Sequence, residues 1–205
     1  MHIAILCGSN RKVSNSERVC NFIAHRLQHD FPQESPTSTV IRPVEETLPS
    51  WNESIFQSGS ALQASWAPFS TQLQQADAFV FVVPEWNGMA PAGVKNFLQF
   101  CGAKELAHKP ALLVGISSGT GGTYPLMELR VNSYKNNKIC YIPEQVVIRE
   151  VEERLVNFDT PADDKDAYIR ERLGFTLQVL LAYAKALKEM RKVATLAHPK
   201  HPFGM

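Results

Sequence analysis

The chain has 205 residues, 44% of them hydrophobic, and its 21 Lys and Arg against 20 Asp and Glu give a formal charge of +1. This length and apolar content suit one α/β domain spanning residues 1–205, and the balanced charge argues against binding to nucleic acid or an anionic membrane. The apolar stretches are strand-sized and the sequence opens on one without a signal-like region, so we expect a cytoplasmic protein with no membrane partner.

Hydrophobic periodicity predicts strands and helices that alternate along the chain. Strands are expected where short runs are apolar or β-branched, at residues 3–7, 38–42, 78–83, 111–116 and 145–151. Helices are expected where apolar residues recur at helical spacing, at 16–28, 68–75, 91–102, 124–136 and in a long final helix capped by Asp163 and Asp164. Residues 43–65 are expected to form a long connection, and the chain from about residue 194 a loosely ordered tail.

The cysteines and histidines predict neither a disulfide framework nor a metal site. The cysteines are too widely spaced for a paired motif, at Cys7, Cys20, Cys101 and Cys140. We expect them to be buried as small hydrophobic residues. His25 and His29 lie one helical turn apart, but no third ligand is near them in the sequence, so we expect a solvated face.

Apolar strands separated by amphipathic helices are typical of a parallel sheet covered by helices on both faces. With five strands, the predicted fold is α/β with a flavodoxin-like, doubly wound strand order. In such sheets, ligands bind beyond the carboxyl ends of the strands, where the strand order reverses. The loops after the first, third and fourth strands are therefore the candidate sites.

The loop after the first strand leads straight into a helix and carries Ser9, Arg11, Ser14, Asn15 and Ser16. Free amide N–H groups at a helix start, hydroxyl donors and a planar cation suit a phosphate group. The alternative is a local role, with Ser14 and Glu17 forming a capping box and Arg11 in solvent. The loop lacks the glycine-rich dinucleotide fingerprint and the Gly-Lys-Ser/Thr ending of a P-loop.

The loop after the third strand starts at Pro84 and carries Glu85, Trp86, Asn87 and Gly88 before Pro91 begins the next helix. Trp86 offers an aromatic face, and Asn87-Gly88 can turn the backbone so that N–H groups point at a flat ring. The alternative is a plain strand-to-helix turn with Trp86 in the core. Glu85 has no carboxylate or histidine near it in sequence, so no catalytic acid or base is predicted.

The loop after the fourth strand carries Ser118, Gly119, Gly121 and Gly122. Glycines just past a buried strand permit close approach of the backbone to a ligand, although a flexible surface loop has the same composition. The three loops share one character at one edge of the sheet, and together they predict a flat, phosphorylated ligand, namely a flavin.

At these residues the chain resembles the NADPH-dependent FMN reductase family of flavodoxin-like proteins, which includes quinone, azo-dye and chromate reductases. The family's Gly-Ser-x-Arg-x-x-Ser loop is matched by Gly8, Ser9, Arg11 and Ser14. Its Pro-Glu-Tyr-Asn loop and the following Pro-Gly and Lys-Asn pairs are matched by Pro84, Glu85, Asn87, Pro91, Lys95 and Asn96. The chain departs from the pattern at Trp86 for Tyr, Ala92 for Gly, Val94 for Leu and Gln99 for Asp.

The resemblance implies an enzyme with FMN as cofactor that passes hydride from NADPH or NADH through flavin N5 to a flavin, quinone or azo acceptor. It implies that Ser9, Arg11, Ser14 and Ser16 hold the phosphate and that residues 85–88 and 119–122 border the isoalloxazine, with Trp86 as a wall for flat acceptors. It also implies a homodimer or homotetramer. Two alternatives stay open, a flavodoxin-type electron carrier without nicotinamide oxidation, which the balanced charge and Arg11 disfavour, and an interaction module without flavin.

Overall fold

The structure is a computed structural model that describes residues 1–43, 47–194, 196 and 199–200. Within these residues the strands form one parallel sheet, made of β1 (His2–Cys7), β2 (Thr37–Ile41), β3 (Ala78–Pro84), β4 (Pro110–Ile116) and β5 (Cys140–Ile148). The sheet has the order β2-β1-β3-β4-β5, so the direction of winding reverses between β1 and β3. This is the predicted flavodoxin-like order, which is thereby confirmed.

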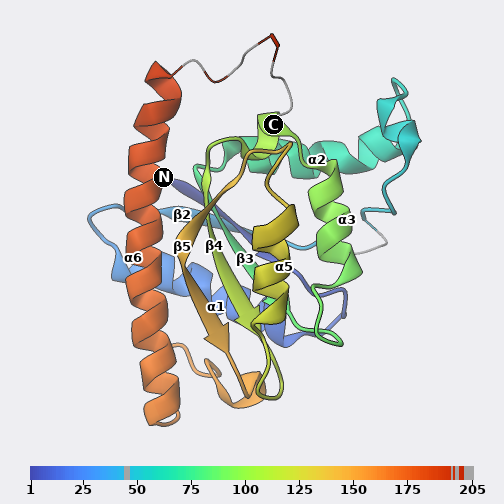
Figure 1. Ribbon diagram of the computed structural model, residues 1–205. Helices are drawn as coiled ribbons and strands as arrows, with labels where there is room; N and C mark the ends of the chain where they lie inside the picture. Colours follow the sequence, from blue (N-terminus) through green and yellow to red (C-terminus); the bar gives the residue numbers. More distant parts are fainter. Residues whose placement is uncertain (44–46, 195, 197–198, 201–205) are drawn as a thin grey trace.

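Helices cover both faces of the sheet (Figure 1). They are α1 (Asn15–Asp30), α2 (Ala61–Gln75), α3 (Ala92–Phe100), α4 (Ala103–Leu106), α5 (Tyr124–Asn132) and α6 (Asp164–Val193), with short 3-10 turns η1 (Glu53–Phe56) and η2 (Val151–Glu153). No helix in the described part of the chain is long and apolar enough to cross a membrane. The predicted loose tail falls largely on residues outside the described ranges.

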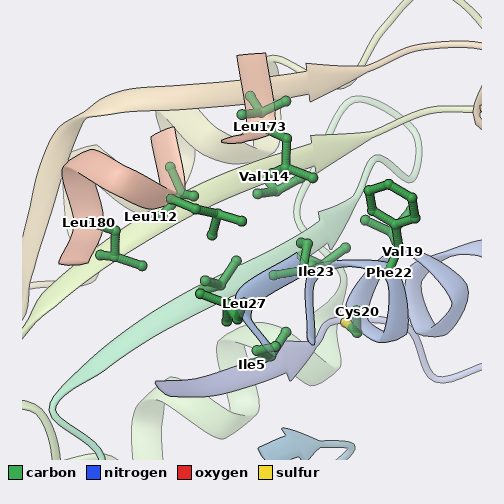
Figure 2. Close-up of a cluster of buried hydrophobic side chains, with 14 of the residues drawn as sticks. Ile5, Val19, Cys20, Phe22, Ile23, Leu27, Leu112, Val114, Leu173 and Leu180 are labelled. Atoms are coloured by element: carbon green, nitrogen blue, oxygen red, sulfur yellow. The ribbon is translucent and has the colours of Figure 1, made fainter. Parts of the chain in front are cut away.

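Side chains alternate along the strands and so build two cores on opposite faces of the sheet. In β1, Ile3 and Ile5 face α1 and α6, whereas Ala4 and Leu6 face α2, α3 and α5. Figure 2 shows the first core, in which side chains of α1 and α6 pack on β1 and β4, among them Ile5, Val19, Phe22, Ile23, Leu112, Val114, Leu173 and Leu180. Strand β3 is buried along its whole length, because it lies between both layers.

Helix α2 begins seven residues before its predicted start at Pro68, so the long connection predicted for 43–65 is partly wrong. The Ser60 hydroxyl accepts the Gln63 amide at 3.2 Å and caps the helix. Trp66 is buried and packs against Phe100, with ring centroids 5.2 Å apart. Pro68 is exposed inside the helix. The aromatic packing holds the helix together despite the hydrogen bond that a proline removes.

Strand β5 begins five residues earlier than predicted and ends at Ile148 instead of residue 151. Its early part includes Pro143, which lies at an irregularity in the pairing with β4, between Ala111 and Leu113. Proline has no N–H group to donate to a neighbouring strand. It is tolerated at this position because β5 is an edge strand and the pairing with β4 is interrupted there. The sequence rule that proline excludes a strand therefore failed at a position that only sheet order identifies.

Two helices are shorter than predicted, for local reasons. The helix expected over 91–102 stops at Phe100, and Gly102, whose amide donates to Glu105 Oε2 at 2.9 Å, starts the separate helix α4. The helix expected over 124–136 ends at Asn132, and Asn137 then donates to the Ser133 carbonyl at 3.0 Å. The final helix is confirmed, with Asp163 as its N-cap. Of the cysteines, Cys140 is only half-buried and the others are buried.

Candidate functional site

The loops after β1, β3 and β4 line one open cleft of about 490 Å³ at the carboxyl edge of the sheet. Most of the predicted site residues line it, namely Ser9, Arg11, Ser14, Asn15, Ser16, Pro84, Glu85, Trp86, Asn87 and Ser118. The predicted glycines Gly88, Gly119, Gly121 and Gly122 lie in the same loops but outside this lining. The cleft therefore lies at the loops that the sequence predicted. The glycines do not line it.

The loop between β1 and α1 carries a run of free backbone donors. Within the described part of the chain, the amides of residues 12–16 have no hydrogen-bond acceptor. The neighbouring amides are satisfied, because Arg11 donates to Ser9 Oγ at 3.2 Å and Glu17 to Ser14 Oγ at 3.1 Å. Helix α1 starts directly behind these donors and adds its positive end. Such a row of N–H groups at a helix start is a fitting site for a phosphate group.

Ser14 is the N-cap of α1, which is one half of the predicted capping box. The other half is not formed in the described chain, because the Glu17 carboxylate pairs with Arg42 and not with the Ser14 amide. The Ser14 oxygen accepts the Glu17 amide, and a hydroxyl can donate its own hydrogen at the same time. Ser14 Oγ also lies 4.0 Å from Cys7 Sγ, beneath the loop. Hydrogen bonding by the Cys20 thiol, helped by the Ser9 amide and Ser14, lowers the pKa of Cys7 to about 7 although the thiol is buried.

The loop after β3 is a tight hairpin that holds an indole ring at the cleft. Trp86 and Met89 exchange backbone hydrogen bonds of 3.0 and 2.9 Å, and Asn87 and Gly88 between them have φ values of 50° and 75°. Positive φ at both central positions is the requirement of a two-residue type I′ turn, which Asn-Gly meets. Trp86 is 46% exposed, so the alternative of a core tryptophan is wrong.

Arg11 reaches across the cleft to this hairpin. Its guanidinium carbon lies 4.8 Å from the centroid of the Trp86 ring, which is a cation–π contact. The contact joins the loop after β1 to the loop after β3. Arg11 is exposed to solvent, as the local interpretation expects, and it also contacts the aromatic wall.

Glu128 of α5 fixes the far end of the hairpin. Its Oε2 accepts the Ala90 amide at 2.8 Å, and its Oε1 pairs with Lys95 at 3.0 Å. The bond from the Ala90 amide, more than the nearby Lys95, lowers the pKa of this carboxyl group. Glu128 is far from the hairpin in sequence, and no motif pointed to it.

The loop after β4 is held from two sides. Glu85 accepts the Gly122 amide at 2.5 Å, and Arg149 donates to the carbonyls of Thr120 and Gly121 at 2.5 and 3.2 Å. A Cβ on Gly121 would lie 2.6 Å from the Glu85 carboxylate, and Gly122 has a φ of 97°. The glycines therefore allow the loop to pack closely against Glu85, which explains why they do not line the cleft.

The loop after β5 forms a further wall that the sequence did not indicate. Val151 lines the cleft together with Arg18, whose guanidinium donates to the carbonyls of Val151 and Arg154, each at 2.5 Å. Glu152 accepts from Asn15 at 3.2 Å and from Ser118 at 2.5 Å, and the Ser118 bond is the main reason that the pKa of Glu152 is lowered. Other lining residues that were missed are Val13, Ile116 and Ser117.

These features fit FMN at both of its ends. Free amides and hydroxyls at the start of α1 suit the phosphate, and an exposed indole beside a hairpin suits a flat ring. The volume of about 490 Å³ is in the range of cofactor sites. The amides of Asn87 and Gly88 have no acceptor in the described chain, so they are available to a ring edge.

The strand order and the helices on both faces of the sheet define a flavodoxin-like protein with an open cleft at the carboxyl edge of its sheet. A profile of the NADPH-dependent FMN reductase family matches residues 1–153, and the chain belongs to that family. It is accordingly an oxidoreductase that uses FMN with NADPH or NADH as electron donor. This confirms the predicted function and enzyme class over the alternatives of an electron carrier or a flavin-free module.

Named proteins of similar sequence and structure agree with this family. A probable NADPH:quinone oxidoreductase 1 of Oryza sativa subsp. japonica is 28% identical over 192 residues, which cover 92% of this chain and 94% of the relative. An NADPH azoreductase of Bacillus sp. (strain OY1-2) is 24% identical over 192 residues, or 94% and 97% of the two chains. The solved structure of FerB, a flavoenzyme NAD(P)H:(acceptor) oxidoreductase of Paracoccus denitrificans, superposes with a TM-score of 0.64 at 19% identity, covering 92% and 97%.

Proposed function

We propose that FMN lies in this cleft with its phosphate at the amides of residues 12–16 and its ring beside Trp86 and the loop after β4. The observation that carries the proposal is the run of amides without acceptors in the described chain, in one cleft with an exposed indole. Ser9, Arg11, Ser14, Asn15 and Ser16 then surround the phosphate, and Pro84 to Asn87 and Ser118 border the ring. Gly88, Gly119, Gly121 and Gly122 shape the loops that carry these residues.

FMN supplies the hydride chemistry when it is bound, and the chain supplies binding and orientation. Trp86 offers a flat, half-exposed face to a second aromatic molecule. Glu85 is bonded to Gly122 and Glu128 to Ala90, so both carboxylates hold loops in place. We therefore assign no acid or base catalyst, and the cleft works by positioning the donor and then the acceptor.

The acceptor that we propose is a quinone, with azo compounds and free flavins as further flat acceptors. The names of the rice and Bacillus relatives support these two classes. An indole face stacks well on planar, electron-poor rings, and the open cleft gives such molecules access. The proposed location is the cytoplasm, because nicotinamide donors are intracellular and the four cysteines are free thiols.

We also propose that residues 1–205 are one FMN-binding domain that assembles as a homodimer or a homotetramer. The support is an apolar stripe on the outer side of α5 and just beyond its end, formed by Tyr124, Met127, Val131 and Tyr134. Val131 is 76% exposed and Tyr124 70% exposed. Exposed apolar stripes of this kind mark contact surfaces, and the stripe lies on the same side of the sheet as the Glu128-anchored hairpin.

The decisive experiment is an absorbance spectrum of the purified protein, followed by titration with FMN and anaerobic addition of NADPH and NADH. We expect bound flavin, bleaching of its visible absorbance by a nicotinamide, and recovery on addition of a quinone. Binding of FMN without bleaching by either nicotinamide would contradict the proposed reaction. Failure to bind FMN at all would contradict the proposed site.

A further inference from the structure

Arg42 follows β2 directly and forms hydrogen bonds, from outside the cleft, with the loop between β1 and α1, where the phosphate is proposed to bind. Its Nη2 donates to the carbonyl of Lys12 at 2.7 Å and also to the carbonyl of Arg11. Its Nη1 pairs with the Glu17 carboxylate at 2.9 Å. Arg42 is not among the residues that line the cleft, whereas Arg11, Val13 and Ser14 are. The loop therefore lies between Arg42 and the cleft.

These two hydrogen bonds set the direction of the peptide units in the loop. In a trans peptide the C=O and N–H groups point in opposite directions, and the described chain has no cis bond here. Because the carbonyls of Arg11 and Lys12 point at Arg42, the amides of Lys12 and Val13 point away from it. They belong to the run of amides that have no acceptor in the described chain. Arg42 thus holds these donors on the side of the cleft.

Arg42 also balances a charge that would oppose an anion. Glu17 is in the first turn of α1, close to the free amides, and a bare carboxylate there would repel a phosphate. The ion pair with Arg42 at 2.9 Å neutralises it. Arg42 Nε is buried and has no acceptor in the described chain, so the other contacts of the guanidinium must offset that cost.

We infer that Arg42 is a positioning residue that gives this site its preference for FMN over riboflavin, which has the same ring without the phosphate. The inference rests on the proposed function, because it assigns a role at the proposed phosphate site. The contacts of Arg42 are with Arg11, Lys12 and Glu17, and it does not line the cleft beside Trp86. Its loss should therefore weaken binding of the phosphate group and leave binding of the flavin ring unchanged.

The test compares dissociation constants of FMN and riboflavin, measured by quenching of flavin fluorescence, for the wild type and Arg42→Met. We expect the FMN dissociation constant to rise about ten- to hundredfold and the riboflavin constant to stay within about twofold. Arg42→Lys keeps the charge but lacks the planar guanidinium that bonds two carbonyls and Glu17 at once. Its FMN dissociation constant is therefore expected to lie between those of the wild type and Arg42→Met. Inorganic phosphate should also compete less well with FMN in Arg42→Met.

Arg130→Met is the matched control. Arg130 likewise holds backbone carbonyls, with a 2.8 Å bond to Ile142, but at the amino end of β5 and so at the opposite edge of the sheet. We expect it to lose stability without changing the ratio of the two flavin affinities. Urea unfolding of each variant shows whether folding is intact.

The outcomes separate this inference from the proposed function. A wild type that binds neither flavin contradicts the proposed function. A wild type that binds FMN, with an unchanged FMN to riboflavin ratio in Arg42→Met, overturns the role of Arg42 alone. If Arg42→Met does not fold, Arg42→Lys decides, and an unchanged ratio in that variant overturns the inference.

Discussion

Charged side chains around the cleft bind mainly the backbone of neighbouring loops. Glu85 holds the Gly122 amide, Arg18 holds the carbonyls of Val151 and Arg154, and Arg42 holds that of Lys12. A hydrogen bond to a charged group is stronger than a neutral one, and losing it leaves a backbone group unsatisfied. The peptide groups held by these bonds therefore have a fixed direction before any ligand arrives.

Trp86 gives a prediction at this scale. In Trp86→Ala the flat wall of the cleft is lost and Arg11 loses its aromatic partner at 4.8 Å. We expect the KM for a quinone to rise about three- to tenfold, which corresponds to an aromatic stacking contact, with a smaller change in FMN affinity. Steady-state kinetics and FMN titration measure the two. Trp86→Tyr is the control and should retain most of the wild-type KM, and an unaltered quinone KM in Trp86→Ala would refute the role.

At the scale of single elements, helix starts and the connections they anchor decide local stability. Helix α6 begins at Asp164, and its buried Asp166 accepts the amides of Leu155 and Ala162 at 2.7 and 3.0 Å. Arg170, one turn later, pairs with the same carboxylate at 2.9 Å. This arrangement ties the connection after η2 to the first turns of the longest helix.

The cap of α2 is tested by Ser60→Ala. The variant removes the acceptor of the Gln63 amide at the helix start, and we expect a loss of about 1 kcal/mol in the free energy of unfolding. Urea denaturation measures it. Ser65→Ala is the control, because Ser65 bonds back to the Ala61 carbonyl inside the same helix and its removal should change stability by less than about 0.5 kcal/mol. Equal effects of both changes would show that Ser60 does not cap α2.

Asp166 predicts how stability depends on pH. Burial alone would raise its pKa, but the amides of Leu155 and Ala162 and the charge of Arg170 outweigh burial and lower it. Since the pKa is lower in the folded chain, the contribution of Asp166 is fully present above its unfolded value of about 3.9 and is lost as pH falls through the folded value below that.

Asp166→Asn should therefore cost about 3 kcal/mol at pH 7, because it leaves the buried Arg170 without its carboxylate, with only the carbonyls of Asn157 and Phe158 as acceptors. The difference from the wild type should shrink as the pH is lowered below about 4. Urea unfolding at pH 7, 5 and 3 measures both effects. Glu189→Gln, which removes an exposed pair with Lys192, is the control and should have no measurable effect. A difference that stays constant with pH would show that Asp166 is not the titrating group.

At the scale of the whole molecule, one sheet separates two cores and brings distant loops to one edge. The central strand β3 is buried on both faces, and the winding reverses between β1 and β3. The loop after β1 therefore leads to a helix on one face of the sheet, and the loop after β3 leads to a helix on the opposite face. The cleft lies between these two loops. Helix α5, which carries the apolar stripe, lies in the layer on one face of the sheet (Figure 1).

Val131 tests the proposed assembly. Val131→Lys puts a charge in the middle of the stripe, so we expect the dissociation constant of the dimer to rise at least about tenfold. Analytical ultracentrifugation over a range of concentrations measures it. Val193→Lys changes another exposed valine, at the end of α6, which belongs to the layer on the opposite face of the sheet from α5, and should leave assembly unchanged. A wild type that sediments as a monomer would exclude the dimer.

Much of this protein could be read from local patterns of residues. Apolar strands alternating with amphipathic helices predict the sheet. Asn87-Gly88 is a typical pair for a tight turn, and Ser14 is a typical N-cap for the start of α1. These signals are local because each depends on residues a few positions apart. For the same reason, the three loops and most of the residues that line the cleft were predictable.

The supports of the cleft depend on partners that only the tertiary structure brings together. Arg18 lies 136 positions from Arg154, Asn15 lies 137 from Glu152, and Arg42 lies 30 from Lys12. No spacing rule links such pairs, because their separation depends on sheet order and loop lengths and not on helical or strand period. Packing also overrode local preference at Pro68 and Pro143, where a helix and an edge strand continue through a proline.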